Sequence, residues 1–293
     1  MATLREIKNR VTAVKNTSKI TQAMRMVAAA KLRRAQEAIT AARPFADKLQ
    51  LILGNLAAAE TDFAHPFFEA RKEVKAIAVI VVSSDRGLCG GFNTNVFRAL
   101  TQHLVALSKE YPSALITLIP VGRRASSSLG KGVVPIAKNY PDVFGKLSFS
   151  TAQDIADLVS NGFLSTRFDK VEAVYNKFIS TMRQEVVVSQ ILPIAPAETV
   201  KAATRPVDYI FEPSRADILD TLLPTYLNIQ VWRALLESNA SEQAARMMAM
   251  ENATNNARDL ISSLQLIYNR ERQATITKEM LEIVGGAEAL SGQ

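Results

Sequence analysis

The sequence of 293 residues is poor in the side chains that most often carry chemistry. It has one cysteine, Cys89, and two histidines, His65 and His103, which lie far apart in the chain. A single cysteine excludes a disulfide within the chain and a zinc site built from several thiolates. Two distant histidines do not favour a histidine-based catalytic centre. We therefore expect neither a metal ion nor a cofactor.

Long hydrophobic runs are also missing. No stretch of 18 apolar residues occurs, so no segment is expected to span a bilayer. The opening residues, MATLREIKNR, lack the apolar centre of a signal peptide. Aromatic residues make up only 6% of the chain, and alanine and leucine supply much of its 48% hydrophobic content. Because both favour helix, we expect a helix-rich protein. From the single cysteine and the missing apolar segments, we expect a soluble protein of a reducing compartment that can dock on something embedded in a membrane.

Acidic residues are scarce at the start of the chain. The first 48 residues hold 11 lysines or arginines and three acids, a net charge of +8, whereas the whole chain carries +7. No aromatic residue precedes Phe45 and no helix-turn-helix pattern is present, which argues against nucleic acid as the partner. We expect this segment to face an acidic protein surface. The basic residues chosen to test this are Lys15, Lys19, Arg33 and Arg34.

The N-terminal segment, residues 1–57, is expected to form one long helix with a coiled-coil seam. Residues 3–53 contain no glycine, and Pro44 is the one residue that would bend or break the helix. Steps of three and four residues meet apolar side chains at eight of eleven positions, as in a coiled coil. Ile20, Met24 and Val27 form a second stripe beside it. The seam positions are Leu4, Ile7, Val11, Val14, Ser18, Thr21, Arg25, Ala28, Leu32, Ala35 and Ile39.

The C-terminal segment, residues 213–293, mirrors the first. Residues 215–284 contain no glycine, Pro224 is expected to kink the helix, and Gly285-Gly286 is expected to end it. A heptad-like seam is predicted at Ala253, Ala257, Leu260, Leu264, Ile267, Glu271, Ala274, Lys278 and Leu281. Since neither terminal helix has another evident partner, we expect the two to pair as an antiparallel coiled coil.

The middle of the chain, residues 73–212, alternates strand and helix patterns. Strands are predicted at 76–82, 114–121, 171–179 and 185–192, and helices at 93–107 and 151–164. This alternation predicts a small α/β, Rossmann-like domain. The expected fold is therefore α+β: a long antiparallel coiled coil of the terminal helices with an inserted α/β domain.

A glycine-rich loop, residues 84–93, follows the first predicted strand and opens a helix. That position suits phosphate binding, but the loop lacks the P-loop ending and the dinucleotide-binding spacing, so a tight turn is the favoured interpretation. Cys89 is expected to be a small buried residue. Asp154 and Asp157 are expected on a solvated face, His65 in a loop and His103 on a helix.

Five segments, in order along the chain, resemble the gamma subunit of rotary F-type ATP synthases. They are Ile7–Arg10 continuing through Asn16–Leu32, Ser83–Asn93, Asn176–Ile179, Ser241–Met250 and Ile276–Ala289. The resemblance implies a central rotor shaft that couples rotation of a membrane c-ring to ATP synthesis or hydrolysis in an alpha/beta hexamer. It also implies contact with an epsilon subunit and no catalytic residue in this chain.

The resemblance assigns roles to particular residues. Met24 aligns with a shaft contact to a beta subunit, and Tyr209 and Glu212 align with the foot near the c-ring. Photosynthetic relatives add a cysteine pair, which is missing here, so no thiol switch is expected. A bacterial plasma membrane, on its cytoplasmic side, is the implied location. The C-terminal residues aligned with beta-subunit contacts are Arg272, Gln273, Thr277 and Glu279. The alternative is a phosphate- or nucleotide-handling α/β enzyme whose helices form a dimerisation stalk.

Overall fold

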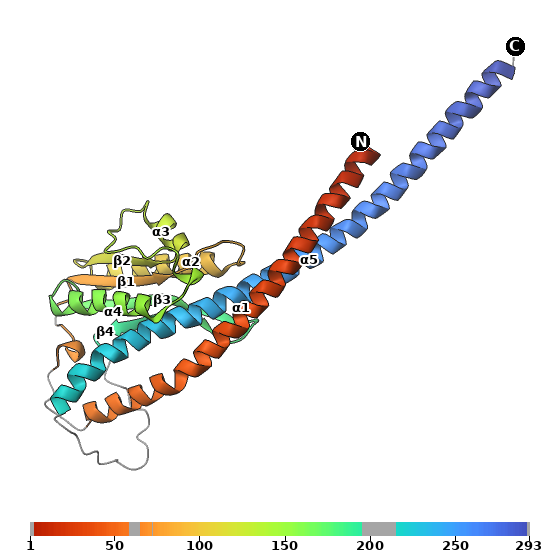
Figure 1. The fold of residues 1–293 in the computed structure, drawn as a ribbon. Helices are drawn as coiled ribbons and strands as arrows, with labels where there is room; N and C mark the ends of the chain where they lie inside the picture. Colours follow the sequence, from red (N-terminus) through yellow and green to blue (C-terminus); the bar gives the residue numbers. More distant parts are fainter. Residues whose placement is uncertain (1–2, 59–64, 72, 195–214, 292–293) are drawn as a thin grey trace. The chain divides into compact units, whose positions relative to one another are not determined.

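The computed structural model describes residues 3–58, 65–71, 73–194 and 215–291. They divide into two compact units. One consists of the described residues of Met1–Ala28 and Met247–Gln293, and the other of those of Ala29–Arg246. Two long helices, α1 (Leu4–Ala58) and α5 (Arg215–Ser291), contribute to both units (Figure 1). The helix α1 continues through Pro44 without a break.

The larger unit contains a four-stranded sheet. Its strands are β1 (Ala76–Val82), β2 (Leu115–Val121), β3 (Lys170–Phe178) and β4 (Gln184–Leu192). They lie in the order β2-β1-β3-β4, with β1 parallel to both neighbours and β4 antiparallel to β3. The helices between them are α2 (Phe92–Glu110), α3 (Arg123–Leu129) and α4 (Phe149–Leu164), with short 3₁₀ turns at Pro66–Phe68 and Val143–Gly145. The predicted central α/β part of the fold, a sheet with intervening helices, is confirmed.

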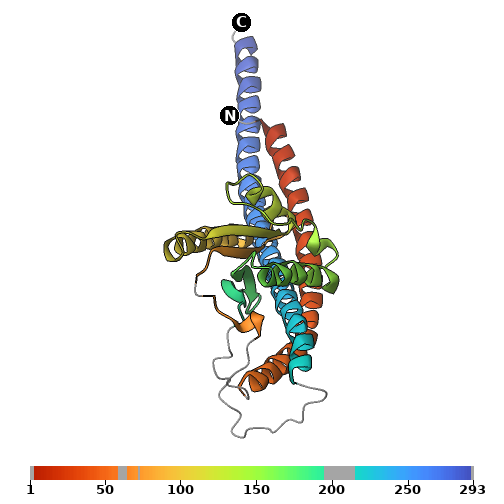
Figure 2. The same cartoon turned by 90° about the vertical axis from the view of Figure 1, so that its left-hand side faces the viewer.

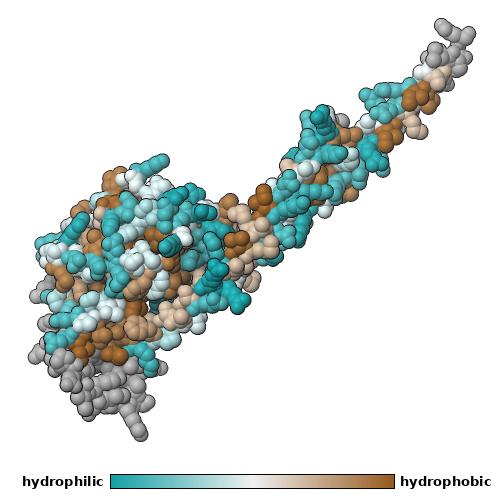
Figure 3. Space-filling view, in the orientation of Figure 1, coloured by the Kyte–Doolittle hydropathy of each residue, from teal (hydrophilic) through white to brown (hydrophobic). Residues whose placement is uncertain are grey.

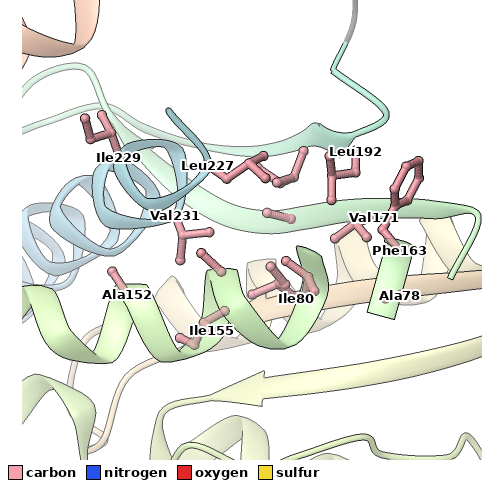
Figure 4. Packing of buried hydrophobic residues seen from close by; sticks show 14 of the residues in the cluster. Ala78, Ile80, Ala152, Ile155, Phe163, Val171, Leu192, Leu227, Ile229 and Val231 are labelled. Atoms are coloured by element: carbon pink, nitrogen blue, oxygen red, sulfur yellow. The ribbon is translucent and has the colours of Figure 1, made fainter. Parts of the chain in front are cut away.

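Strand β1 is buried on both faces, which explains its uninterrupted apolar sequence. Ile77, Val79 and Val81 face a cluster that includes Val96 and Leu100 of α2. The alternate residues of β1 face a second, larger cluster, and Figure 4 shows Ala78 and Ile80 of β1 beside side chains of α4 and α5. Each face of the strand therefore has its own core.

The larger cluster corrects one expectation, that the terminal helices bury apolar side chains only against each other. Both terminal helices contribute to this cluster, together with residues of α4 and the sheet. The buried members are Ala46, Leu49 and Leu53 of α1, and Leu219, Leu223, Leu227, Ile229, Val231 and Leu235 of α5. Figure 4 shows Leu227, Ile229 and Val231 of α5 in the same layer as Ala152 and Ile155 of α4. The cause is geometric, because α4 alone is too narrow to cover this face of a twisted sheet.

The smaller unit is an antiparallel pair of helices, the first part of α1 and the last part of α5. The predicted seam of α1 is confirmed in this unit, since each of its positions from Leu4 to Ala28 is buried or half-buried. The coiled-coil fold class is likewise confirmed. Two cross-helix contacts set the register: Thr21 Oγ1 lies 2.8 Å from Thr254 Oγ1, and Arg25 Nη1 lies 3.6 Å from Glu251 Oε1.

The seam of α5 differs in phase from the prediction. Leu260 and Ile267 are 40% and 45% exposed, whereas Ile261 and Tyr268 are half-buried. Two apolar stripes share Leu264, and the partner helix selects one of them. If the register at Thr21 continues along both helices, each seam position of α1 from Leu4 to Arg25 lies opposite one of α5. The seam positions found on α5 are Met250, Thr254, Ala257, Ile261, Leu264, Tyr268 and Glu271.

The end of α5 also differs from the prediction. The helix continues through Gly285 and Gly286 to Ser291, so this glycine pair is not its stop. In Figures 1 and 2 the blue end of α5 extends beyond the N-terminal end of α1. Within the described residues, no helix combines the length and the apolar character needed to cross a bilayer.

Candidate functional site

The glycine-rich loop after β1 is held by the chain's own polar groups. Asn93 Oδ1 accepts a hydrogen bond from the Ser84 amide at 3.0 Å, and Asn93 Nδ2 donates to Ser84 Oγ at 2.7 Å. Asp85 accepts from the amides of Arg123 and Phe144 at 3.0 and 2.7 Å. Because these groups stabilise a turn, the geometry favours the tight-turn interpretation over phosphate binding.

Helix α5 lies against the same loop. Arg246 Nη2 donates to the carbonyl oxygens of Arg86 and Gly87 at 3.3 and 3.4 Å. In open α/β sheets, ligands bind at the carboxyl ends of the strands, where the strand order reverses. Here β1 is the strand at which the order reverses, and an arginine of α5 contacts the loop at its carboxyl end. This arrangement does not favour the alternative of a nucleotide-handling enzyme.

The candidate reactive side chains are each buried or bonded to other groups of the chain. Cys89 is buried, and burial raises the pKa of its thiol, which disfavours the reactive thiolate. His65 caps the 3₁₀ turn by accepting from the Phe67 amide at 3.2 Å. His103 Nε2 lies 2.5 Å from Glu172 Oε2. Asp154 pairs with Lys138 at 2.7 Å. Within the described ranges, no group of three or more histidine, cysteine or acidic residues could hold a metal ion.

The end of α5 is an extended exposed segment of the smaller unit. Every residue from Arg272 to Ala287 is exposed. The last seam position, Glu271, falls opposite Leu4 if the register at Thr21 continues, so the following turns have no seam partner in α1. Their apolar side chains nevertheless share one helix face by their spacing. This face, the terminal stripe, consists of Ile276, Met280, Ile283 and Val284, which are 48–71% exposed. Figure 3 shows brown patches along this part of the helix.

The predicted contact residues occupy two separate levels of the helix pair. Arg272, Gln273, Thr277 and Glu279 are all exposed near the start of the terminal segment. Met24 is half-buried beside Arg25, which pairs with Glu251. Glu251 and Arg272 are 21 residues apart on α5, roughly 30 Å along a helix at 1.5 Å per residue. The structure therefore does not bring these residues into one site.

Other predicted residues have the following positions. Lys15, Lys19, Arg33 and Arg34 are exposed on α1, and Arg33 pairs with Glu37 at 3.1 Å. Beside Met24, Ile20 is 60% and Val27 57% exposed, so the second stripe is accessible in this chain. Tyr209 and Glu212 lie outside the described residues.

Two features escaped the sequence analysis. The terminal stripe was obscured because the predicted seam was carried on to Leu281. The contact between Arg246 and the glycine-rich loop had only a weak signal, since Glu242 and Arg246, four residues apart, look like an ordinary solvated pair. In the structure both side chains are mostly buried, with 4% and 13% exposed.

Comparisons with known proteins agree with the fold. A sequence model of the family described as ATP synthase matches residues 3–290. An ATP synthase gamma chain from Geobacter metallireducens is 46% identical over 292 residues, covering 100% of both chains. One from Chloroherpeton thalassium is 45% identical and covers 99% of both.

Solved structures are similar as well. A chain from the central stalk and c-ring of Tetrahymena thermophila mitochondrial ATP synthase superposes with a TM-score of 0.58 and 26% identity, covering 80% of this chain and 99% of that one. A rotor chain of the Euglena gracilis mitochondrial enzyme gives a TM-score of 0.63 at 21% identity, covering 93% and 98%, and supports the fold alone. The length of these matches, their identity over the whole chain and the paired terminal helices lead to one conclusion: this chain belongs to the ATP synthase gamma chain family.

Proposed function

We propose that the chain is the central rotor shaft of a proton-translocating F-type ATP synthase. In this role it couples rotation of a membrane c-ring to ATP synthesis or hydrolysis in an alpha/beta hexamer. The similar Tetrahymena structure is of a central stalk and c-ring, and a second similar structure, from Euglena, includes F1 and the c-ring. The chain itself has no catalytic role in this proposal.

The observation that carries the proposal is the exposed terminal segment of α5. A helix that continues past its coiled-coil partner with an apolar face uncovered is suited to insertion between other subunits. Around the terminal stripe, Arg272, Gln273, Thr277 and Glu279 supply hydrogen-bonding groups. We propose that these four residues contact beta-subunit loops as the shaft turns.

A second contact level is proposed at Met24. The exposed Ile20 and Val27 flank it on one face of α1, and an unbranched, polarizable thioether suits a contact that must break and re-form. A rotor that touches each beta subunit differently biases the open and closed states of the three catalytic sites differently. The two proposed contact levels lie about 30 Å apart along the shaft.

The remaining assignments belong to the same proposal. The larger unit would hold the epsilon subunit and rest on the c-ring, with Tyr209 and Glu212 as proposed c-ring contacts. The family places the chain as a peripheral subunit of its complex. Because the relatives named above include gamma chains of bacteria such as Geobacter, we propose the cytoplasmic side of a bacterial plasma membrane.

Reconstitution tests the proposal. The purified chain should bind an alpha/beta hexamer and, with the membrane sector, restore ATP-driven proton pumping. Alone it should neither bind ATP saturably nor hydrolyse it. Saturable ATP turnover by the isolated chain, without hexamer binding, would instead support the nucleotide-handling alternative.

Met24→Lys is expected to impair coupling without unfolding the chain. If the added ammonium pairs with an acidic group on one beta subunit, it over-stabilises one rotor angle by about 1–3 kcal/mol. ATPase activity should be retained, and proton pumping should fall. The measurements are the melting temperature, ATPase rate and pumping rate of the assembled complex.

The matched control is Met26→Lys, which adds the same charge to a neighbouring exposed methionine on another face. It should leave pumping unchanged. A stability loss of about 2–5 kcal/mol in the Met24 variant, the range for losing a core methionine, together with failed assembly would show that Met24 only fills the seam.

Charge reversal on α1 is expected to weaken coupling in a salt-dependent way. Replacing Lys15, Lys19, Arg33 and Arg34 by glutamate removes the attraction to an acidic partner, and salt screens both attraction and repulsion. Pumping per ATP hydrolysed should fall at low ionic strength and recover partly as salt is added. Reversal of Lys109 and Lys131, exposed on the α/β domain, serves as the control. If both sets of substitutions lowered pumping per ATP hydrolysed to the same extent, the result would contradict an interaction between the basic surface of α1 and an acidic partner.

A further inference from the structure

The contact between α5 and the rest of the larger unit changes character along the helix. Up to Leu235 the buried residues of α5 are mainly large and apolar. From Glu237 onward they are mostly polar or small, which makes this interface unusual for the interior of a domain. The buried residues are Glu237, Ser238, Ala240, Ser241, Glu242, Gln243 and Ala244.

This polar stretch has few directed attachments to the α/β domain. Ser241 Oγ donates to the Asn176 carbonyl oxygen at 3.2 Å. Arg246 Nη2 donates to the carbonyl oxygens of Arg86 and Gly87, as described above. Apolar burial is non-directional, whereas a guanidinium bonded to fixed carbonyl oxygens specifies both the rotation and the height of a helix. The arginine contact therefore fixes the rotation and the height of α5 relative to the loop.

Arg246 is in turn held by α5 itself. Its Nη2 lies 2.7 Å from Glu242 Oε1, and its Nη1 donates to Gln243 Oε1 at 3.2 Å. The other carboxylate oxygen of Glu242 is buried without a hydrogen-bond partner in the described chain. Burial raises the pKa of Glu242, an effect that Arg246 opposes. A buried carboxylate that is only half satisfied is costly, so packing alone does not account for it.

The loop that Arg246 holds is strained at its tip. Leu88 has a φ of +62° and is 65% exposed. Non-glycine residues persist in this region only where their surroundings impose it. Arg246 is also the last residue of the larger unit, and Met247, the next residue of the same helix, belongs to the other unit. The contact between Arg246 and the loop therefore lies at the last residue of α5 that belongs to the larger unit.

We propose that Glu242 is a positioning residue for torque transmission: it orients the Arg246 guanidinium against the carbonyl oxygens of Arg86 and Gly87, and this clasp fixes α5 to the glycine-rich loop. The clasp is defined as Glu242, Arg246 and those two carbonyl groups. The proposal rests on the rotor function proposed above. In that setting, a loosened clasp lets α5 turn or slide on the domain, so that rotation is lost between the foot and the shaft.

Glu242→Gln tests the proposal, and the chain offers a matched control. Glu237 is also a buried glutamate of α5 with one unpartnered oxygen, and it pairs with an arginine four residues away at 3.0 Å. Within the described residues, the hydrogen bond and ion pair of the Glu237 carboxylate are with Arg233 and not with the glycine-rich loop. Glu237→Gln therefore imposes the same chemical change and a similar burial cost without touching the clasp.

The first measurement is hydrogen exchange over residues 83–91 in the full chain. Glu242→Gln should accelerate exchange there by about tenfold, since the loop loses a charge-assisted attachment. Glu237→Gln should leave the loop unchanged. Equal acceleration in both variants, or none in either, would overturn the proposal.

The second measurement is the ratio of proton pumping to ATP hydrolysis in the assembled complex. Glu242→Gln should lower this ratio while ATPase activity persists, and Glu237→Gln should not. Arg246→Lys provides a second route if Glu242→Gln folds poorly. It keeps the ion pair but replaces a forked donor by a point charge that does not span both carbonyl oxygens and Gln243.

Arg246→Lys should therefore accelerate loop exchange and lower the pumping ratio in the same direction. A wild-type ratio in both clasp variants would refute the clasp as a torque contact. Failure of the rotor proposal looks different, because the wild-type chain itself would then neither bind the hexamer nor support pumping.

Discussion

Gly122→Ala is expected to lower the free energy of unfolding of the larger unit by about 4 kcal/mol. Gly122 follows β2 with a φ of +95° and a ψ of 147°, a region open almost only to glycine. A Cβ atom there would lie 2.4 Å from the Ser83 carbonyl oxygen. Ser83 is fixed on both sides, because its amide donates to the Val121 carbonyl oxygen at 2.9 Å and its Oγ accepts from the Ala125 amide at 2.7 Å. The backbone therefore has little room to relax.

Trp232, the only tryptophan of the chain, lies in the larger unit and reports its unfolding by fluorescence in urea. Gly145→Ala is the control, since a Cβ atom there would meet nothing within 4 Å, and it should change stability by less than about 0.5 kcal/mol. A midpoint for Gly122→Ala equal to that of the control would show that the β2–α3 junction is not closely packed.

Asp169→Asn is expected to destabilise the larger unit by about 3 kcal/mol. The carboxylate of Asp169 joins three donors at the start of β1: the Arg71 guanidinium and the backbone amides of Lys75 and Ala76, the last two at 2.7 and 2.8 Å. A carboxylate accepts from all three. Asparagine must turn its NH₂ group either toward Arg71 or toward the two amides, and so it leaves buried donors facing each other.

The same site predicts a pH dependence. Burial by itself would raise the pKa of Asp169, but the hydrogen bonds from Arg71 and the two amides outweigh it, and the net pKa is lowered from the ordinary 3.8. A lowered pKa means that the folded state disfavours protonation. The stabilisation is therefore present above pH 3.8 and is lost as the pH falls through the lowered value.

Urea unfolding of wild type and Asp169→Asn at several pH values should show the stability difference shrinking below about pH 4. Asp154→Asn is the matched control, because Asp154 pairs with Lys138 at an exposed position and should contribute less than about 1 kcal/mol. A difference for Asp169→Asn that stays constant with pH would mean that the carboxylate charge is not responsible.

The fold was largely predictable because its strongest signals are local. The uninterrupted apolar run of β1 predicts a strand buried on both faces, and the sequence of α1 has one dominant apolar stripe. The phase of α5 was not predictable from its own sequence, since Leu264 belongs to two stripes and only the register with Thr21 distinguishes them. Packing of Leu219 to Leu235 on the sheet was missed for a similar reason, because the area that α4 leaves open is a property of the assembled domain.

The candidate contacts had a different origin. The contact roles of Met24 and Arg272 were predicted from the family resemblance, because the local sequence does not indicate which partner an exposed helix side chain contacts. Glu242 and Arg246 show the opposite case. Their spacing is typical of surface pairs, and only the position of the glycine-rich loop reveals that they are buried and directed at a backbone.

The unpaired end of α5 has a consequence for the order in which the complex forms. From Arg272 to Ala287 every residue of the helix is exposed, and Gly285 and Gly286 each disfavour helix by about 1 kcal/mol. A single helix of this length is only marginally stable in water, because nucleation is costly and there is no tertiary packing to offset it. Its helix–coil equilibrium would then be decided by whatever surrounds it, so the last turns would fold as they are enclosed. Part of the binding free energy would be used for that ordering, so the surrounding subunits would bind the end of α5 less tightly.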